Sequence, residues 1–368
     1  MPEPAVDADA DPAAVRRRRA AAQRLTATPA PGADPVAVVR HLLAVQAQDL
    51  RAARLALRAR TSGLTAADVD GALADRSLVA GWLLRGTLHL VAAEDFGWLL
   101  GLLAPTRAAT SARRLSQERV TPDAADRAVA LIERAVADEG PLTRTELAQR
   151  LGAAGLRTEG QAMPHLLMLA VLRGIAVLGP VRADGSAAFA LAHDWLGAAP
   201  PTALEGDERA RALATLARRY LTAHGPATAA DLAAWSGLPR RDARAGLDAI
   251  AAELTLEGEL VSLTAAAAAP DGSAADGARV PPRLLGAFDP YLLGWRSRAF
   301  AVAPEHADRV HPGGGMVRAV ATVDGAAVGT WTRKRRTGEP LVELFAAVTA
   351  GDMDALRADA EDVLRFER

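Results

Sequence analysis

The order of apolar and polar positions along the chain reveals a repeated pattern of helices. Residues 140–152 recur as residues 225–237, with a Gly-Pro pair, a Thr, a Leu-Ala pair and a closing Gly at matching places. A helical stretch precedes and follows each copy, at residues 123–137, 161–173, 207–223 and 240–252. A repeat of this length predicts that one supersecondary unit occurs at least twice.

Each copy carries the local signals of a helix-turn-helix. In the first copy, Thr143 can cap a short helix whose third position is Glu146, which is the pattern of a capping box. Gly152 would then allow the tight turn before the next helix. The same arrangement is expected in the second copy.

Strand signals follow both copies. Residues 175–181 and 187–191 are apolar runs on either side of Asp184-Gly185, a dipeptide that strongly favours a hairpin. Residues 254–261, after the second copy, alternate between apolar and polar positions as a strand does. Three helices followed by a β-hairpin form a winged helix, so the pattern predicts two such units.

The N-terminal part is expected to form a third, more divergent unit. Asp34-Pro35 can begin a helix, because an acidic cap and a proline at the first position both suit a helix start. Further helices are expected at residues 53–60 and 66–75. Residues 77–84 and 87–91 then alternate around Arg85-Gly86 as the two strands of a wing.

Beyond the third unit the pattern changes toward strands. Residues 265–277 are rich in Ala, Gly and Asp, as linkers are, and strands are expected at residues 283–288, 317–323, 327–331 and 341–345. Gly351-Asp352 is expected to cap a final amphipathic helix.

The sequence thus predicts a mainly α fold with β-hairpin wings, of the α+β class, with three tandem winged-helix units and a C-terminal β-rich segment. The expected parts are a disordered tail (1–12), unit 1 (13–118), unit 2 (119–200), unit 3 (201–264), a linker (265–282) and the C-terminal segment (283–368).

Composition narrows the function mainly by exclusion. The chain has 368 residues, half of them apolar, a net charge of −1 and no cysteine, so disulfides and thiolate metal sites are ruled out. The histidines are not at metal-ligand spacing, and no apolar run is long enough to span a membrane. No Walker loop or dinucleotide fingerprint is present. We expect a cytoplasmic, nucleoid-associated protein that binds no metal, cofactor or membrane.

Arginine clusters suggest a polyanionic partner. Lys334 is the one lysine among 43 basic residues, and the arginines group at 16–19, 113–114, 240–241 and 333–336. A GC-rich coding sequence explains part of this bias, and a single cluster is commonly a solvated face. Several clusters in a neutral protein nevertheless suggest charge gathered on one surface, and arginine binds phosphate bidentately.

One short polar segment is unusual for an apolar helix. In Gln46-Ala47-Gln48 the two glutamines would diverge by about 200° on a helix, but lie on one side if the chain straightens. Two amides presented together can hold a water or a sugar oxygen. The alternative is a solvent-exposed helix end. Glutamine is neither acid nor base, so the pair suits a reaction that needs positioning rather than proton transfer.

Together with other stretches, this segment resembles the AlkZ/YcaQ-like winged-helix DNA glycosylases. The resemblance runs from about residue 17 to 366 and rests on the Gln46-Ala47-Gln48 segment and on residues 55–60, 85–90, 288–294 and 323–331. It implies three tandem winged helices that cradle duplex DNA, with Gln46 and Gln48 as the catalytic pair. The second Gln, which some relatives replace by Asp, places the chain nearer the AlkZ branch.

The implied activity is monofunctional hydrolysis of the N-glycosidic bond of cationic alkylated purines of the N7-alkylguanine type. Bulky natural-product adducts and interstrand crosslinks are included, in repair or in self-resistance to a genotoxin. An N7- or N3-alkylated purine is already cationic, so it leaves without protonation. The enzyme then has to stabilise a cationic sugar and place a water, which two neutral amides can do.

Further residues are expected around this pair. Arg85 and His89 on the first wing, together with Arg333, Lys334, Arg335 and Arg336, are expected to contact DNA; Asp49, Asp289 and Tyr291 are expected to support the site. His89 could equally be a structural histidine, and an Asp before a Pro is commonly a turn residue.

Two functions of other classes remain open at this point. Winged helices mostly read DNA sequence, so a transcription regulator is one alternative; a lesion-binding protein without catalysis is another. Three units without a coiled-coil seam favour a monomer that wraps double-stranded DNA bearing alkylated bases.

Overall fold

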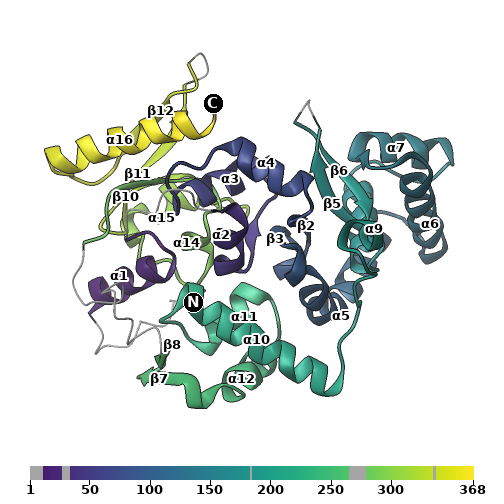
Figure 1. Ribbon diagram of the computed structural model, residues 1–368, viewed down its shortest axis with the longest axis horizontal. Coiled ribbons are helices and arrows are strands. Elements are labelled where there is room, and N and C mark those ends of the chain that lie inside the picture. Colours follow the sequence, from purple (N-terminus) through teal and green to yellow (C-terminus); the bar gives the residue numbers. More distant parts are fainter. Residues whose placement is uncertain (1–10, 27–33, 183–184, 265–278, 335–336) are drawn as a thin grey trace. The chain divides into compact units, whose positions relative to one another are not determined.

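The chain forms two compact units, one of residues 1–68 with 213–368 and the other of residues 69–212. The computed structural model describes residues 11–26, 34–182, 185–264, 279–334 and 337–368 (Figure 1). The chain passes between the units within α4 (Ala66–Ala74) and α10 (Gly206–His224). The six parts expected from the sequence have boundaries that follow the repeat rather than the two compact units. These expected boundaries stay a prediction.

The smaller unit packs helices against an antiparallel sheet. Its strands lie in the order β3-β2-β5-β6-β4. They are β2 (Leu78–Trp82), β3 (Leu88–Ala92), β4 (Leu142–Thr143), β5 (Ala176–Val181) and β6 (Ala187–Leu191). The helices are α5 (Ala93–Gln117), α6 (Pro122–Glu139), α7 (Arg144–Ala153), α8 (Ala162–Leu172) and α9 (Ala192–Leu196), with the 3-10 turn η1 (Leu84–Gly86) between β2 and β3.

The first copy of the repeat forms the expected helices and wing in this unit, as α6, α7 and α8 followed by the hairpin β5–β6. The capping box is confirmed: Glu146 N donates to Thr143 Oγ1 (3.3 Å), and Thr143 N donates to Glu146 Oε2 (2.7 Å). The expectation for Gly152 is wrong, because this residue lies inside α7. The left-handed turn comes later, at Gly155 (φ 73°).

The second copy lies mainly in the larger unit, as α10, α11 (Ala229–Ser236) and α12 (Arg240–Asp248), followed by the 3-10 turn η2 (Ala251–Glu253). Here Gly237 does end a helix, in the left-handed conformation (φ 74°). The single strand expected at 254–261 is instead a hairpin of β7 (Leu254–Glu257) and β8 (Leu260–Leu263). Gly258, at φ 60°, supplies the tight turn that reverses the chain.

The rest of the larger unit joins N-terminal helices to a C-terminal sheet. The N-terminal elements are α1 (Pro12–Ala22), α2 (Pro35–Leu42), β1 (Val45–Gln46) and α3 (Leu50–Arg58). The sheet has the order β12-β11-β10-β9 and consists of β9 (Arg283–Leu285), β10 (Val320–Val323), β11 (Ala326–Arg333) and β12 (Pro340–Leu344). Short helices α14 (Pro290–Leu293), η3 (Pro304–His306) and α15 (Ala307–Val310) lie between β9 and β10 in sequence.

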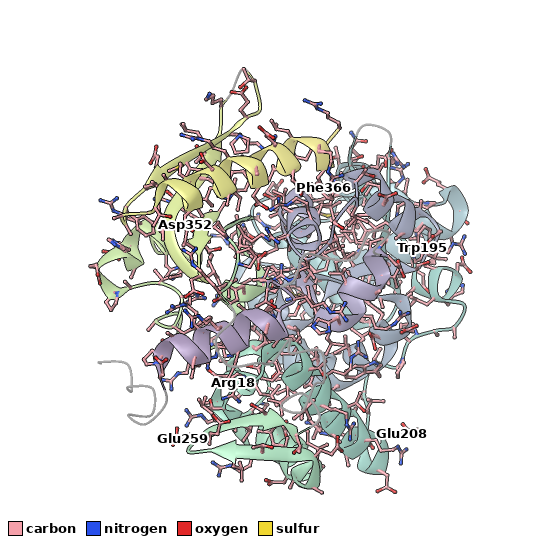
Figure 2. The ribbon with its side chains drawn as sticks, turned by 60° about the vertical axis from the view of Figure 1, so that its left-hand side comes forward. Arg18, Trp195, Glu208, Glu259, Asp352 and Phe366 are labelled. Atoms are coloured by element: carbon pink, nitrogen blue, oxygen red, sulfur yellow. The ribbon has the colours of Figure 1, made fainter. Side chains whose placement is uncertain are left out.

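The final helix, α16 (Ala350–Phe366), contacts both α3 and β9 and runs from near Asp352 to Phe366 (Figure 2). Its cap is Thr349 rather than the expected Gly351-Asp352, because the helix already begins at Ala350. Asp352 accepts a hydrogen bond from Thr349 Oγ1 instead (2.7 Å). No helix in the described part of the chain is long and apolar enough to cross a membrane.

Candidate active site

The segment that carries Gln46 and Gln48 is extended and lies between two helices. Helix α2 ends at Leu42, and Leu43 adopts a left-handed conformation (φ 66°) that prevents the helix from continuing. Asp49 then starts α3 by accepting a hydrogen bond from Ala52 N (3.1 Å). The motif is therefore bounded by helix termini on both sides, with Asp49 as the N-cap of α3; a role of Asp49 in the site stays a prediction.

The two glutamines lie on the same side of this segment and contact each other. Gln46 Nε2 donates a hydrogen bond to Gln48 Oε1 over 3.0 Å, while Ala47 points the opposite way into the core. This follows from the alternation of side chains along an extended backbone. Gln48 is exposed and Gln46 is half-buried, so the pair faces solvent. The small residue between them is a core residue.

This arrangement can bind and orient but cannot exchange protons. Each amide limits the rotation of the other, so the pair is partly ordered before a ligand arrives. The donation from Gln46 Nε2 leaves Gln46 Oε1 and the second lone pair of Gln48 Oε1 as acceptors, and Gln48 Nε2 as a donor. Carbonyl oxygens suit a neighbouring cation or a water that donates a hydrogen bond to them. The pair therefore fits a reaction with a cationic transition state.

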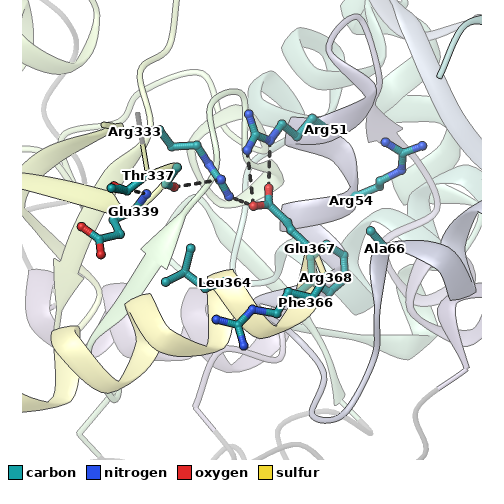
Figure 3. A pocket seen from close by; sticks show the side chains of 11 residues that line it. Arg51, Arg54, Ala66, Arg333, Thr337, Glu339, Leu364, Phe366, Glu367 and Arg368 are labelled. Atoms are coloured by element: carbon teal, nitrogen blue, oxygen red, sulfur yellow. Dashed lines mark hydrogen bonds and ion pairs between the residues drawn. The ribbon is translucent and has the colours of Figure 1, made fainter. Parts of the chain in front are cut away.

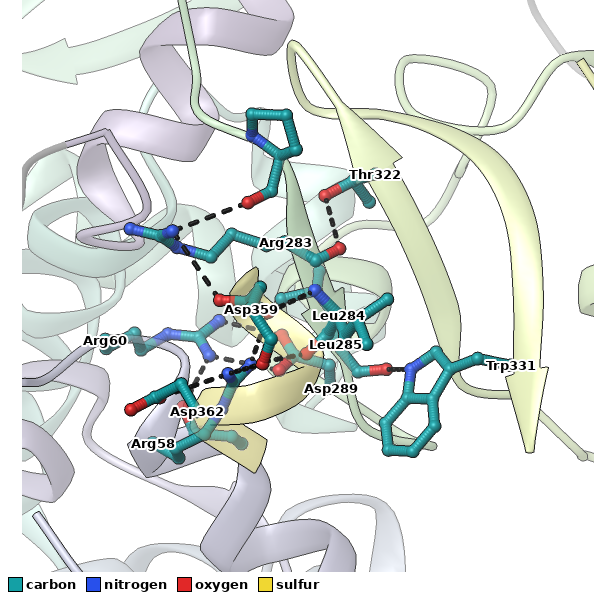
Figure 4. A network of polar contacts seen from close by, with 12 residues as sticks. Arg58, Arg60, Arg283, Leu284, Leu285, Asp289, Thr322, Trp331, Asp359 and Asp362 are labelled. Carbon is teal, nitrogen blue, oxygen red and sulfur yellow. Dashed lines mark hydrogen bonds and ion pairs between the residues drawn. The ribbon is translucent and has the colours of Figure 1, made fainter. Parts of the chain in front are cut away.

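Helix α3, which follows the motif, is anchored by a buried arginine (Figure 4). Arg58 donates to the backbone oxygens of Leu284 (2.7 Å) and Asp359 (3.1 Å) and pairs with the Asp359 carboxylate (2.9 Å). The Asp359 carboxylate also accepts from Leu284 N (2.7 Å). One arginine thus ties the C-terminal end of α3 to β9 and α16.

A second buried ion pair holds the chain just beyond α3. Arg60 donates to both carboxylate oxygens of Asp289 (2.7 and 3.0 Å), and both side chains are fully buried. The same guanidinium donates to Gln23 Oε1 on the chain after α1 (2.7 Å). Asp289 also caps α14 by accepting from Tyr291 N (2.9 Å). Asp289 therefore lies in the interior, and its support of the site stays a prediction.

Tyr291, the other residue expected to support the site, is also interior. Its hydroxyl donates to Gly325 O (2.9 Å), and burial raises its pKa well above the usual range. Its ring packs edge-on against Trp295 and Phe300. These contacts hold the turn between β10 and β11, and the role of Tyr291 in the site stays a prediction.

His89 and Arg85 lie in the smaller unit. His89 is only 2% exposed, and its Nδ1 is 2.9 Å from Thr87 O. Burial and the neighbouring Arg85 lower the pKa of His89 to about 3, so the ring is neutral at physiological pH. A neutral, buried imidazole does not attract a phosphate, and this placement favours the structural alternative. Arg85 is half-buried in a left-handed turn (φ 53°), and its contact with DNA stays a prediction.

The basic hairpin between β11 and β12 is placed only in part. Lys334 is exposed and pairs with Glu339 (2.9 Å), and Arg333 forms an ion pair with Glu367. Arg335 and Arg336 lie outside the described residues. The hairpin stays our prediction for phosphate contact.

The arginines of α1 do not form the basic surface that their clustering suggests. Arg16 and Arg17 both bind the carboxylate of Asp324, Arg18 pairs with Glu257, and Arg19 is buried with its Nε donating to Pro226 O (3.0 Å). These side chains attach α1 to the rest of the larger unit. Charge patterning alone could not distinguish this role from DNA binding.

Comparison with known proteins identifies the family. The model of the family "DNA glycosylase AlkZ-like" matches residues 39–366. This chain belongs to the AlkZ-like DNA glycosylases. The matched range contains Gln46 and Gln48 and also the buried arginines Arg58 and Arg60.

One relative of the AlkZ-like chain is similar along most of its length. It is the "interstrand DNA cross-link repair glycosylase" of Streptomyces sahachiroi, 32% identical over 309 residues, which cover 80% of this chain and 81% of the relative. The solved structure of the S. sahachiroi DNA glycosylase AlkZ superimposes with a TM-score of 0.76 and 29% identity, covering 97% of this chain and 96% of that one. The predicted fold class and the predicted enzyme class, a DNA glycosylase, are confirmed.

Sequence reasoning about this AlkZ-like glycosylase missed the roles of Arg58 and Arg60. Both fall in the stretch 55–60 that carried the resemblance, but they read as ordinary helix arginines. Their partners lie more than 200 residues away in sequence, since Arg60 and Asp289 are separated by 229 positions. The available signal was the presence of two arginines in the otherwise apolar stretch 55–60, because a buried arginine requires a buried acid.

Proposed function

We propose that this AlkZ-like glycosylase hydrolyses the N-glycosidic bond of cationic alkylated purines in duplex DNA, with Gln46 and Gln48 as the catalytic pair. The observation that carries the proposal is the 3.0 Å contact between the two amides on an extended, solvent-facing segment. We place the reaction in DNA repair or in self-resistance to a genotoxin, carried out by a monomer at the nucleoid.

The chemistry of the substrate explains why an amide pair suffices. A purine alkylated at N7 carries a positive charge and leaves as a neutral base, so no acid has to protonate it. The charge passes to the sugar, where preorganised dipoles can stabilise it. The acceptor oxygens of Gln46 and Gln48 can face this cation and hold the attacking water beside it.

The nucleophile in this proposal is water rather than an amine. A glycosylase that also cuts the strand forms a Schiff base through an amine. The only lysine of the chain is Lys334, which lies at the basic hairpin and pairs with Glu339. Because its ammonium group is already engaged by Glu339 (2.9 Å), this lysine is a poor Schiff-base nucleophile, which supports a monofunctional enzyme.

Exposure of the pair bears on the size of the adduct. Gln48 is exposed and Gln46 half-buried, whereas enzymes that flip a base enclose it in a snug pocket. An open pair can accept a bulky adduct. The S. sahachiroi relative is named for repair of interstrand cross-links, which supports bulky adducts and crosslinks as substrates here too.

The proposal is tested by the rates of base release from matched duplexes. We expect release from a duplex with N7-methylguanine and none above background from the same duplex with uracil, whose neutral base needs protonation or a stronger nucleophile. Both rates should be the same in EDTA, because the amide mechanism uses no metal. Among the described residues no group of three His, Asp or Glu side chains could hold one. Loss of activity in EDTA that a divalent ion restores would contradict the mechanism.

Affinity for undamaged duplex should fall steeply with salt. Each phosphate contact contributes about −0.9 to the slope of log K against log salt for B-DNA. Replacing Lys334, Arg335 and Arg336 by Gln should flatten the slope by about that amount for each side chain that touches a phosphate.

A matched control for the hairpin variant is Arg357→Gln, an exposed arginine on α16 that pairs with a near neighbour, Asp354. Its slope should stay that of the parent. Tight binding to one palindromic sequence would contradict the account and point to a transcription regulator.

A further inference from the structure

A cavity of about 540 Å³ lies beside α3 in the larger unit, between the β11–β12 hairpin and the end of α16 (Figure 3). Four of its lining side chains are arginines, namely Arg51, Arg54, Arg333 and Arg368, and two are acidic, Glu339 and Glu367. The lining is thus rich in groups that bind phosphate in a bidentate manner.

A carboxylate occupies part of this cavity and is held between two arginines. Arg51 Nε donates to Glu367 Oε1 (2.8 Å) and Arg51 Nη2 to Glu367 Oε2 (3.3 Å), and Arg333 pairs with the same carboxylate. Glu367 and Arg333 are only 16% and 19% exposed, whereas Arg51 is 51% exposed. Two guanidinium groups around one anion is the arrangement that binds a phosphate.

Two of the arginines in the cavity, Arg51 and Arg333, share one carboxylate. Glu339 lies at the far side and pairs with Lys334, so Glu367 alone faces both Arg51 and Arg333. Burial, together with the nearby Arg51, lowers the pKa of Arg333 to about 10. An added anion would relieve this repulsion between arginines.

The cavity is close to the glutamine pair along the chain. Arg51 lies in the first turn of α3, three residues after Gln48. Three residues span at most about 10 Å. Each strand of duplex DNA carries one phosphate per about 3.4 Å of helix axis. A nucleotide held at Gln46 and Gln48 therefore brings a phosphate of its own strand within reach of Arg51.

We propose that this cavity is a seat for a phosphodiester of the DNA strand that carries the lesion, and that Glu367 fills the seat until DNA displaces it. The proposal rests on the proposed function, because it places the seat beside the catalytic pair. Arg51 and Arg333 would bind the phosphate, and Glu367 would act as an internal competitor that weakens binding to DNA.

The test uses the full chain and a short undamaged duplex, with affinity measured over a range of salt concentrations. Glu367→Gln keeps the size of the side chain and removes the competing charge, so it should tighten binding several-fold and steepen the salt slope by up to about 0.9, the value for one phosphate. Arg51→Gln should flatten the slope by a similar amount. In the double variant Arg51→Gln/Glu367→Gln, the gain in DNA affinity expected from Glu367→Gln alone should largely disappear, because the seat has lost one of its two arginines.

The matched control is Glu361→Gln, which removes a charge from an exposed position on α16, the helix that Glu367 follows. It should leave the slope unchanged. The proposal would be overturned if Glu361→Gln steepened the salt slope as much as Glu367→Gln does. It would also be overturned if the slope of Glu367→Gln were unchanged or flatter than that of the parent. The second result would mean that Glu367 only stabilises the fold. Arg51 is half-exposed, so Arg51→Gln should leave the fold intact and tests the seat from its arginine side.

Failure of the proposed function would look different. Binding to undamaged duplex requires no excision, so the slopes test the seat on their own. If the variants show the predicted slopes but the parental protein releases no base, the glycosylase mechanism is contradicted. The phosphate seat is then still supported. On a duplex with N7-methylguanine, Arg51→Gln should raise the enzyme concentration needed for half-maximal release several-fold, with a smaller effect on the maximal rate.

Discussion

Replacing Gln46 or Gln48 by alanine is expected to slow release of an alkylated base by about 10²–10³-fold, the usual cost of losing one electrostatic group in an active site. Each change removes one amide and also frees its partner from the 3.0 Å hydrogen bond that orients it. The two losses should therefore not add in the double variant. The measurement is the single-turnover rate of base release from a duplex with N7-methylguanine.

The fold and DNA affinity of these variants should stay close to those of the parent. Gln48 is exposed, and the core contact of the segment is made by Ala47. Gln149→Ala, an exposed glutamine on α7, is the matched control and should release base at the parental rate. Gln48→Asp should be the mildest change, because a carboxylate can still orient water. If the double variant released base at the parental rate, the catalytic groups would have to lie elsewhere in the chain. If it unfolded, the pair would be structural.

The largest expected effect on stability comes from Asp289→Ala, which should lower the free energy of unfolding by about 3–5 kcal/mol. The change leaves Arg60 as a fully buried charge without its carboxylate and removes the cap of α14. Urea denaturation gives the value. Asp248→Ala, at an exposed position on α12, should change stability by no more than about 0.5 kcal/mol.

A second pair of variants separates the buried charge from lost packing. Asp289→Asn keeps the shape and one acceptor and should cost less than Asp289→Ala. Replacing both partners, as Arg60→Met with Asp289→Leu, should recover much of the loss, because no unpaired charge remains. A double variant as unstable as Asp289→Ala would show that packing, and not the ion pair, dominates at this position.

The helices and wings could be predicted because their signals are local. The capping box of Thr143 and Glu146 involves residues three positions apart, and the structure confirms it. Gly152 and Gly237 occupy the same place in the repeat, yet only Gly237 ends a helix. A glycine is permitted in the left-handed region but not required to adopt it, so its position in a motif does not fix the turn.

The candidate site was only partly predictable for a related reason. Alternation places Gln46 and Gln48 on one side of an extended segment, and the structure shows the pair in contact. The same rule could not tell whether His89 faces solvent or the interior, because both faces of its strand carry apolar residues. The ion pair of Arg60 and Asp289 joins distant segments, and no periodic pattern reveals such a contact.

We expect this chain to free an intact alkylated base from DNA by means of a neutral amide pair. Mass spectrometry of both products, after incubation with an N7-methylguanine duplex in EDTA, measures this. Free N7-methylguanine should appear together with a strand that keeps all its phosphodiester bonds around an abasic site, and both products should be lost in Gln46→Ala/Gln48→Ala. A cut strand without free base, or an untouched duplex, would contradict it.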